Sequence, residues 1–411
     1  MPPSAQTIGD CGNTVESTYA WLRLVASVLL GTVGSVGIWS YIVALPLVQA
    51  DFGITRADAS LAYTLTMVGF GAGAAVIGSL ADRFGIVAPL KGAVLTLGLG
   101  YFASGLAPSP KQFALANLLI GVGSSGAFAP LIADISHWFT RRRGIAVAIC
   151  SSGNYLGGAM WPPVVQHFIE SGGWRQSQIL IGIACLVTML PLLQVLHRRP
   201  APGSEYDLHA AATNTRANLG VNPYVLFGLL CIAGVACCVA MSMPQVHIVA
   251  YCADLGYGVT RGAEMLSLML GLGIISRIGS GLVADRVGGL AVLLAGSVMQ
   301  AAALFLYALF DGLTPLYVIS GLFGLFQGGI VPMYALIVGD YFPLRQVGTL
   351  VGLLITATIV GMALGAWMSG VIFDLTGSYL QAFLNGFLWN LLNIAIVLFL
   401  MRRRTHRLKF A

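Results

Sequence analysis

The chain contains about twelve long apolar stretches, each long enough to cross a lipid bilayer as a helix. A membrane-spanning helix needs about 20 predominantly apolar residues, and stretches of that length recur between residues 20 and 401. Hydrophobic residues make up 57% of the 411 residues and charged residues only 9%, whereas soluble domains carry about 25% charged residues. These features predict an all-α integral membrane protein.

The predicted spans fall into two sets of six, separated by a polar stretch that contains Pro200, Pro202 and Gly203. The organisation that we expect is a polar tail (1–19), an N-terminal six-helix bundle (20–197), a linker (198–221), a C-terminal six-helix bundle (222–401) and a basic tail (402–411). The predicted helices are 20–47, 59–80, 87–107, 112–136, 144–169, 177–197, 222–252, 262–283, 290–310, 314–338, 347–373 and 379–401.

The positions of the basic residues predict the orientation in the membrane. With both termini on one side, 16 of the 21 Lys and Arg residues fall on that side and four on the other, and Arg277 lies within a span. Cytoplasmic loops carry the excess of Lys and Arg in membrane proteins. We therefore expect both termini in the cytoplasm.

Two sequence patterns recur at one spacing and indicate a duplicated chain. The pattern G-x-x-A-D-R-x-G follows the second predicted helix and also the eighth, 203 residues later. An aromatic pair followed by arginine and glycine, at Phe139 and again at Phe342, has the same spacing. Matched pairs at one offset are typical of transporters built from internal repeats. The turn positions are Gly78, Asp82, Arg83 and Gly85, then Asp285, Arg286 and Gly288.

The repeated turn resembles the signature loop of the major facilitator superfamily. The segment WFTRRRGIAVAICSSGNYLG (138–157) and an arginine inside the eighth helix resemble, more narrowly, the monocarboxylate transporters and the bacterial oxalate/formate exchangers. The resemblance covers about residues 21–401. It implies twelve helices in two pseudo-symmetric bundles and a monomeric carrier in a bacterial inner membrane. In that setting the signature turns would connect the two halves in one conformational state and separate in the other; the alternative is that they are loops with solvated charges that fix the topology.

Arg277 is the main candidate for binding a substrate. A guanidinium is always charged, and a charge at the centre of a span costs roughly 2.5 to 3.5 kcal/mol on insertion scales. It lies eight residues before Asp285, about 12 Å into the membrane, and no acid on its own helix lies within a turn. A planar guanidinium binds a carboxylate through two hydrogen bonds. The alternative is a structural ion pair with an acid on another helix.

The resemblance also identifies positions where this chain differs from its relatives. The animal carriers place an aspartate one turn before the arginine and a lysine on the first helix, whereas this chain has Gly273 and no lysine there. The oxalate-type relatives place a lysine on the eleventh helix, and this chain has no lysine there either. Arg277 is therefore a single cation, which favours a monocarboxylate over a dicarboxylate. Either a proton enters with the undissociated acid or through His247, or the carrier exchanges anions, or transport is not coupled to protons.

Further polar residues inside the predicted helices are candidates for lining the substrate site. His247 follows Pro244, which frees backbone carbonyls, and histidine titrates near physiological pH; a histidine at the membrane interface is the alternative reading. The other candidates are Asn117, Asn154, Tyr155, Gln327 and Tyr334. Hydrogen bonding between helices is an equally good explanation of each of them.

The sequence therefore predicts a secondary transporter, working by symport or antiport, for a small organic anion. Its expected partners are a carboxylate, protons and the lipid bilayer, without nucleic acid, and we expect no enzymatic activity, cofactor or metal site. One alternative is efflux of drugs or aromatic compounds through a cavity lined by Trp39, Trp161, Phe326 and Trp367. A sensor that binds its ligand without transporting it is a further alternative.

Overall fold

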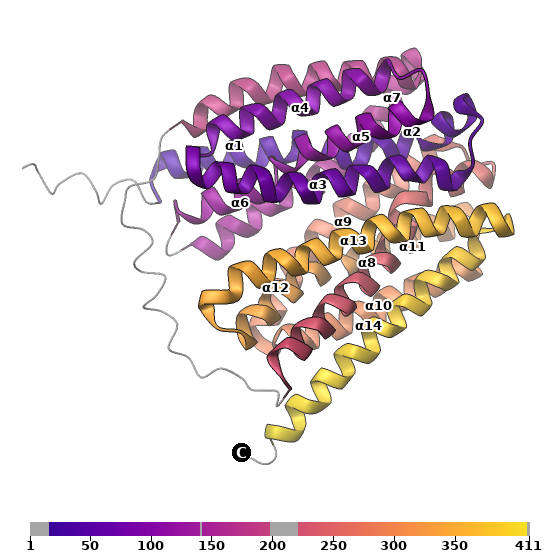
Figure 1. Cartoon of the computed structure of the whole chain (residues 1–411). Helices are drawn as coiled ribbons and strands as arrows, with labels where there is room; N and C mark the ends of the chain where they lie inside the picture. The colour runs from indigo at the N-terminus through magenta and orange to yellow at the C-terminus, as the bar shows by residue number, and fades with distance from the viewer. Residues whose placement is uncertain (1–15, 140–141, 198–220, 409–411) are drawn as a thin grey trace, which may run out of the picture.

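The computed structural model describes residues 16–139, 142–197 and 221–408, in which every regular element is a helix (Figure 1). The predicted all-α membrane fold is confirmed. Almost all of the predicted linker, and most of the predicted N-terminal tail, lie outside the described residues. The first half contains α1 (Thr18–Gly34), α2 (Val36–Phe52), α3 (Arg56–Phe84), α4 (Val87–Gly105), α5 (Pro110–Ser125), α6 (Ala129–Ser136), α7 (Arg143–Leu192) and the 3-10 helix η1 (Leu193–Leu196). The second half contains α8 (Pro223–Asp254), α9 (Val259–Val287), α10 (Gly289–Leu309), α11 (Leu313–Gln327), α12 (Ile330–Tyr341), α13 (Leu344–Thr376) and α14 (Tyr379–Leu408).

The helices cross the membrane twelve times, although the described residues form only 11 continuous apolar segments. The segment Ile145–Leu196 has 52 residues, which as one straight helix would be about 78 Å long, against a hydrocarbon thickness of about 30 Å. It is broken at Gly173, where the backbone has φ 78° and ψ 168°. The break lies between the predicted helices 144–169 and 177–197, so this segment makes two crossings.

The backbone of the two signature turns is nearly identical, as the sequence repeat predicts. α3 is followed by Gly85 at φ 79° and ψ 163°, and α9 by Gly288 at φ 87° and ψ 154°. Glycine adopts such positive φ values without the steric cost that a side chain would bring. The breaks between α5 and α6, after Gly126, and between α11 and α12, after Gly328, also occupy corresponding places in the two halves.

The helices form two bundles, α1 to α7 with η1, and α8 to α14 (Figure 1). They contact each other mainly through two pairs of helices, α3 with α13 and α7 with α9, and to a smaller extent through α2 with α8. Residues 36–45 of α2 and 236–250 of α8 are buried along their whole length. These two helices therefore lie at the centre of the molecule.

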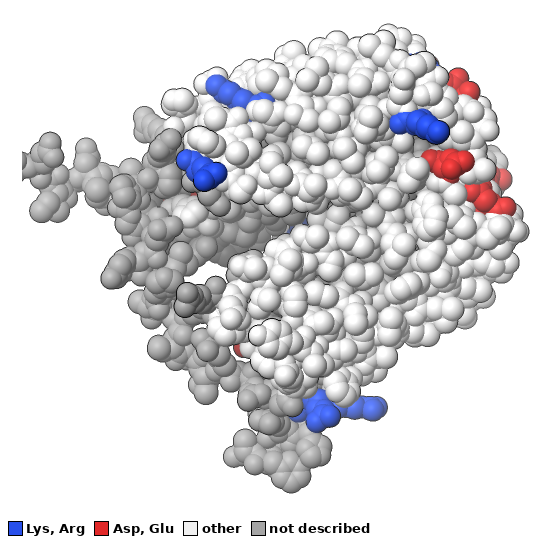
Figure 2. Space-filling view, viewed as in Figure 1, with Lys and Arg blue, Asp and Glu red and all other residues white. Residues whose placement is uncertain are grey.

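The two ends of the molecule differ in charge, and we name them accordingly. The end at which α3 and α9 begin is the acidic end; its acids are Asp51, Asp58, Glu170, Asp254, Glu264, Asp311 and Asp374. The end at which α1 begins and α14 finishes is the basic end. Figure 2 shows Asp and Glu gathered at the acidic end and Lys and Arg mostly at the opposite end.

Candidate functional site

The two bundles are in contact from the acidic end to about the middle of the molecule. Between α7 and α9 the contacts begin where the Thr260 hydroxyl donates to Glu170, at 3.1 Å, and they extend inward as far as Arg277. No hydrogen bond between described residues joins the bundles closer to the basic end than Arg277. Figure 2 shows a hollow between the two halves on that side. Arg277 therefore lies at the inner limit of these contacts between the bundles.

The guanidinium of Arg277 has an aromatic ring and a carbonyl as neighbours, and no carboxylate. Its central carbon lies 4.3 Å from the ring centroid of Tyr155, on α7 of the other bundle. Its Nε lies 3.4 Å from the carbonyl oxygen of Gly328. Among the described residues no acid forms an ion pair with Arg277. Since the side chain is half-buried, it is a cation inside the membrane whose charge is not neutralised by any acid that the structure describes.

Glycines on α9 and after α11 allow this close packing. A Cβ atom built on Gly273 would lie 2.6 Å from the Tyr155 ring, and one on Gly328 would lie 2.3 Å from the Gly273 carbonyl oxygen. Both distances are far below a normal contact. The ring of Tyr155 thus occupies the space beside Gly273 in which the animal carriers would have an acidic side chain. This gives a structural reason for the absence of an acid at this position.

Two glutamines extend the polar surroundings of Arg277. The amide of Gln245 on α8 donates to Oε1 of Gln327 at 3.0 Å, and Gln327 directly precedes Gly328. The Nε2 atom of Gln327 is buried and has no hydrogen-bond partner in the described structure. We call Arg277, Tyr155, Gln245 and Gln327 the central polar cluster.

Trp39, on α2, adds a second free donor close to this cluster. Its indole Nε1 is buried without a partner among the described residues, beside Gly158, one turn along α7 from Tyr155. The sequence suggested Trp39 only as part of an aromatic cavity. Of the other members suggested for that cavity, Trp161 donates to the Thr32 carbonyl at 2.8 Å, and Trp367 lines a separate apolar groove between α3 and α13.

The remaining candidate polar residues differ in whether their hydrogen bonds are satisfied. Asn117 donates to the Phe113 carbonyl at 2.9 Å, and Tyr334 donates to Asn393 at 2.8 Å, so each is bonded within its own bundle. Asn154 directly precedes Tyr155 on α7, is half-buried, and has no hydrogen bond to another described residue. Of these three, Asn154 is the one available to a ligand.

His247 lies between the central polar cluster and the acidic end, and its polar contacts point to the acidic end. Its Nε2 is 2.8 Å from the carbonyl oxygen of Ala366, which can accept a hydrogen bond when this nitrogen is protonated. Its Nδ1 is 3.5 Å from the hydroxyl of Tyr379. The assignment of His247 to the substrate site remains a prediction.

A network of charged groups closes the acidic end. The side chain of Arg56, on the first bundle and only 5% exposed, lies 3.0 Å from the carboxylate of Asp254 and donates to the hydroxyl of Tyr379 at 2.7 Å. The backbone amides of Arg56 and Ala57, at the start of α3, donate to the carboxylate of Asp374 at 2.8 and 2.7 Å. A carboxylate is stabilised at a helix N-terminus by the free amides and the helix dipole. We call Arg56, Asp254, Asp374 and Tyr379 the acidic-end closure.

The sequence did not identify this closure, because the three partners of Arg56 lie 198 to 323 residues after it in the chain. The available signal was that Arg56 is one of only four basic residues on its side of the membrane. Thr55, whose hydroxyl accepts from the Asp58 amide at 3.1 Å, also marks the start of a helix. Neither observation shows that the free amides of α3 face the other bundle.

At the basic end the signature turns are open. Arg83, Asp285 and Arg286 are exposed, and none of them forms an ion pair with another described residue. The side chain of Asp82 lies outside what the structure describes. The expected contact of these turns in another conformational state remains a prediction.

Comparison with known proteins agrees with this architecture. A sequence profile of the Major Facilitator Superfamily matches residues 27–314 and 278–411. The chain is 25% identical to the MFS-type transporter pynF of Aspergillus niger, over 87% of this chain and 82% of that protein. It is 26% identical to monocarboxylate transporter 13 of Bos taurus, over 76% of this chain and 72% of that protein.

The fold is also similar to that of a solved transporter. The structure superposes with a TM-score of 0.68 on a bacterial homologue of the human lysosomal transporter Spinster, solved in an inward-facing and occupied conformation. The superposition covers 95% of this chain and 96% of the homologue, at 16% sequence identity. At that identity the likeness concerns the fold alone.

Proposed function

This chain belongs to the Major Facilitator Superfamily, and from that premise we propose that it carries a small organic anion, most simply a monocarboxylate, across the membrane. The observation that supports the proposal is the guanidinium of Arg277, which lies half-buried between helices of both bundles and has no ion pair with a described acid. Ionised groups within a membrane domain are expensive and are retained for function. Binding an anion would supply the charge that the protein lacks there.

The central polar cluster has the groups that such an anion needs. Arg277 can donate two parallel hydrogen bonds to a carboxylate. The free Nε2 of Gln327, the free indole of Trp39 and the amide of Asn154 are further donors in the same region. The ring of Tyr155 contributes a flat apolar surface beside the charge. These groups together suit a molecule with one charged end and a small uncharged body.

The number of cations in the site supports a monocarboxylate over a dicarboxylate. Arg277 is the only Lys or Arg among the four residues of the central polar cluster. A second carboxylate would lose its hydration without gaining a cation, and an unpaired buried charge is costly. The similarity to monocarboxylate transporter 13 agrees with this choice.

The orientation follows from the distribution of charge. The basic end would face the cytoplasm, since Lys and Arg are enriched on that side of membrane proteins. The hollow next to Arg277 would then open to the cytoplasm, while the acidic-end closure seals the opposite side. Transport would alternate this arrangement with one in which the acidic end opens and the signature turns meet. Because no described acid pairs with Arg277, any coupled proton would travel on the substrate or on His247.

Uptake of labelled lactate into proteoliposomes tests the proposal. We expect Arg277→Ala to lower the rate at least about 100-fold, because a charge-assisted contact with an otherwise unpaired charge is lost. Arg277→Lys would recover part of the activity, since it keeps the charge without the two-pronged geometry. Arg261→Ala is the matched control: Arg261 lies in the first turn of the same helix and pairs with Glu264 at the exposed acidic end.

Two outcomes would contradict the proposal. Lactate uptake by Arg277→Ala at the wild-type rate would remove Arg277 from the site. A thermal-shift series in which dicarboxylates stabilise the protein and monocarboxylates do not would overturn the argument from a single cation. Repeating the uptake with and without a pH gradient measures the coupling.

A further inference from the structure

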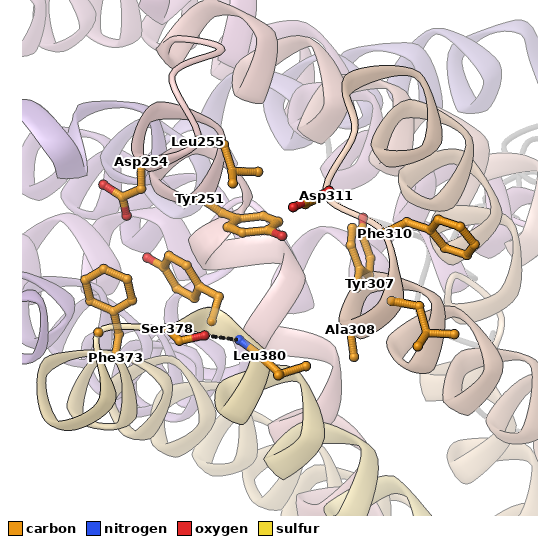
Figure 3. Close-up of a pocket in the computed structure, with 13 residues that line it drawn as sticks. Tyr251, Asp254, Leu255, Tyr307, Ala308, Phe310, Asp311, Phe373, Ser378 and Leu380 are labelled. Carbon is orange, nitrogen blue, oxygen red and sulfur yellow. Dashed lines mark hydrogen bonds between the residues drawn. The ribbon is translucent and has the colours of Figure 1, made fainter.

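A second cavity lies at the acidic end of the C-terminal bundle, away from the central polar cluster. Its volume is about 350 Å³, and it lies among α8, α10, α13 and the start of α14 (Figure 3). None of the four residues of the central polar cluster lines it. The residues that give it chemical character are Tyr251, Asp254, Tyr307, Asp311, Phe373 and Tyr379. It is therefore a separate place where a small molecule can enter from the acidic side.

The lining of this cavity is aromatic and negatively charged. Figure 3 shows the ring of Tyr251 between the carboxylates of Asp254 and Asp311. The rings of Tyr251 and Phe373 each pack on Tyr379, with centroid distances of 5.2 and 4.5 Å. No Lys or Arg is among the described residues that line the cavity. The surrounding surface at this end is also rich in acids (Figure 2), which raises the local concentration of cations.

This combination of groups selects an organic cation over a metal ion. Aromatic faces attract ammonium groups, by about 0.5 to 2 kcal/mol for each good contact, whereas metal ions require several oxygen, nitrogen or sulfur ligands at once. No group of three or more His, Cys, Asp or Glu side chains suitable for a metal occurs in the described part of the chain. Two acids separated by a ring match an ammonium group with an apolar body.

The cavity shares two residues with the acidic-end closure. Asp254 lines the cavity and also lies 3.0 Å from Arg56. Tyr379 lines it and accepts a hydrogen bond from Arg56 at 2.7 Å. A cation bound here would compete with Arg56 for the carboxylate of Asp254, and it would repel the guanidinium. Binding in the cavity and closure of the acidic end therefore oppose each other.

We propose that this cavity is a regulatory site for a small organic ammonium compound, and that its occupancy loosens the acidic-end closure. The ligand enters from the side opposite to the hollow at Arg277. It is distinct from the transported anion, so the proposal does not depend on which carboxylate is carried. By linkage, whatever opens the acidic end also strengthens binding of the cation.

Benzyltrimethylammonium is a suitable probe, because it joins a permanent cation to one aromatic ring. Its binding to the full-length protein in nanodiscs can be measured by calorimetry. We expect Asp311→Asn to weaken binding at least about fivefold, since it removes one carboxylate without touching Arg56. Asp51→Asn, which removes an acid at the same end but outside the cavity, would change the affinity less than about twofold. Benzyl alcohol serves as the uncharged probe.

Opening of the acidic end can be followed with a cysteine at Ser60, which is fully buried against Gly370 of the other bundle. We expect saturating probe to speed maleimide labelling of Ser60→Cys at least about threefold over the background from native cysteines. The proposal is overturned if Asp311→Asn binds the probe like the wild type, if benzyl alcohol binds equally well, or if labelling is unchanged. Binding that is lost in Tyr155→Leu but kept in Asp311→Asn would instead place the cation at the central polar cluster, and would also overturn it.

Discussion

The guanidinium of Arg277 and the ring of Tyr155 face each other across the boundary between the two bundles, 4.3 Å from central carbon to ring centroid. Arg277 is on α9 and Tyr155 on α7. The ring fits closely beside Gly273, one turn before Arg277. A cation at the end of the cross-bundle contacts is therefore held in place by an aromatic ring from the other half of the chain.

The first prediction concerns this ring. Tyr155→Leu should weaken binding of the carboxylate by about 3- to 30-fold, because a cation–π contact is worth about 0.5 to 2 kcal/mol and also orients the guanidinium. Tyr155→Phe keeps the ring and should change the dissociation constant less than about threefold. Titration of the purified protein measures both. Equal weakening by Leu and Phe would show that the hydroxyl acts and the ring does not.

The second prediction concerns Gly273. Gly273→Ala would place a methyl group 2.6 Å from the Tyr155 ring, and overpacking of this kind typically costs about 1 to 3 kcal/mol. We expect a lower melting temperature together with weaker substrate binding, and a larger loss for Gly273→Asp. Gly279→Ala is the matched control on the same helix, because a Cβ there meets no atom within 4 Å. A melting temperature for Gly273→Ala at or above that of Gly279→Ala would contradict the observed packing.

The third prediction concerns the acidic-end closure. Arg56→Ala should raise the rate of maleimide labelling at Ser60→Cys by about 10- to 100-fold, since each charge-assisted hydrogen bond contributes about 1.5 to 3 kcal/mol. Asp374→Asn should act in the same direction and less strongly, because it keeps an oxygen that can accept from α3. Arg175→Ala should raise labelling less than about fivefold, since the pair of Arg175 with Asp51 is exposed and lies within one bundle. Labelling that stays at the wild-type rate in Arg56→Ala would rule out the closure.

The fourth prediction separates two roles for His247. The contacts with Ala366 and Tyr379 associate this side chain with the acidic-end closure. We therefore expect His247→Gln to change labelling at Ser60→Cys while leaving the dissociation constant of the carboxylate within about twofold. A role in the substrate site predicts the opposite, with a weakened dissociation constant and unchanged labelling.

The sequence alone was sufficient to predict the architecture of the chain. Apolar length located the spans, and the repeated G-x-x-A-D-R-x-G turn revealed the duplication, which reappears in the matching backbone of Gly85 and Gly288. Arg277 could be identified because a charged residue inside an apolar helix is unusual, whichever neighbours the helix packs against. These features are local, so the order of the residues is enough to predict them.

Contacts between the bundles could not be predicted in this way. The meeting of Arg56 with Asp374 depends on how two separately formed bundles are placed against each other. From the sequence, Gly273 was only the position of a missing acid, and its relation to Tyr155 follows from the packing of α7 on α9. Pairing between residues hundreds of positions apart leaves no pattern in one chain.

The position of Arg277 at the inner limit of the cross-bundle contacts has a mechanical consequence. In the part of the chain that the structure describes, the hydrogen bonds between the bundles lie on its acidic-end side, so Arg277 lies close to the fulcrum about which the halves would rock. Points near a fulcrum move little while the two ends swing widely. A bound anion would then become accessible from the other side of the membrane without leaving its hydrogen-bond donors. The free-energy difference between the two conformational states would depend mainly on groups at the ends of the molecule, such as Arg56, which do not contact the bound anion.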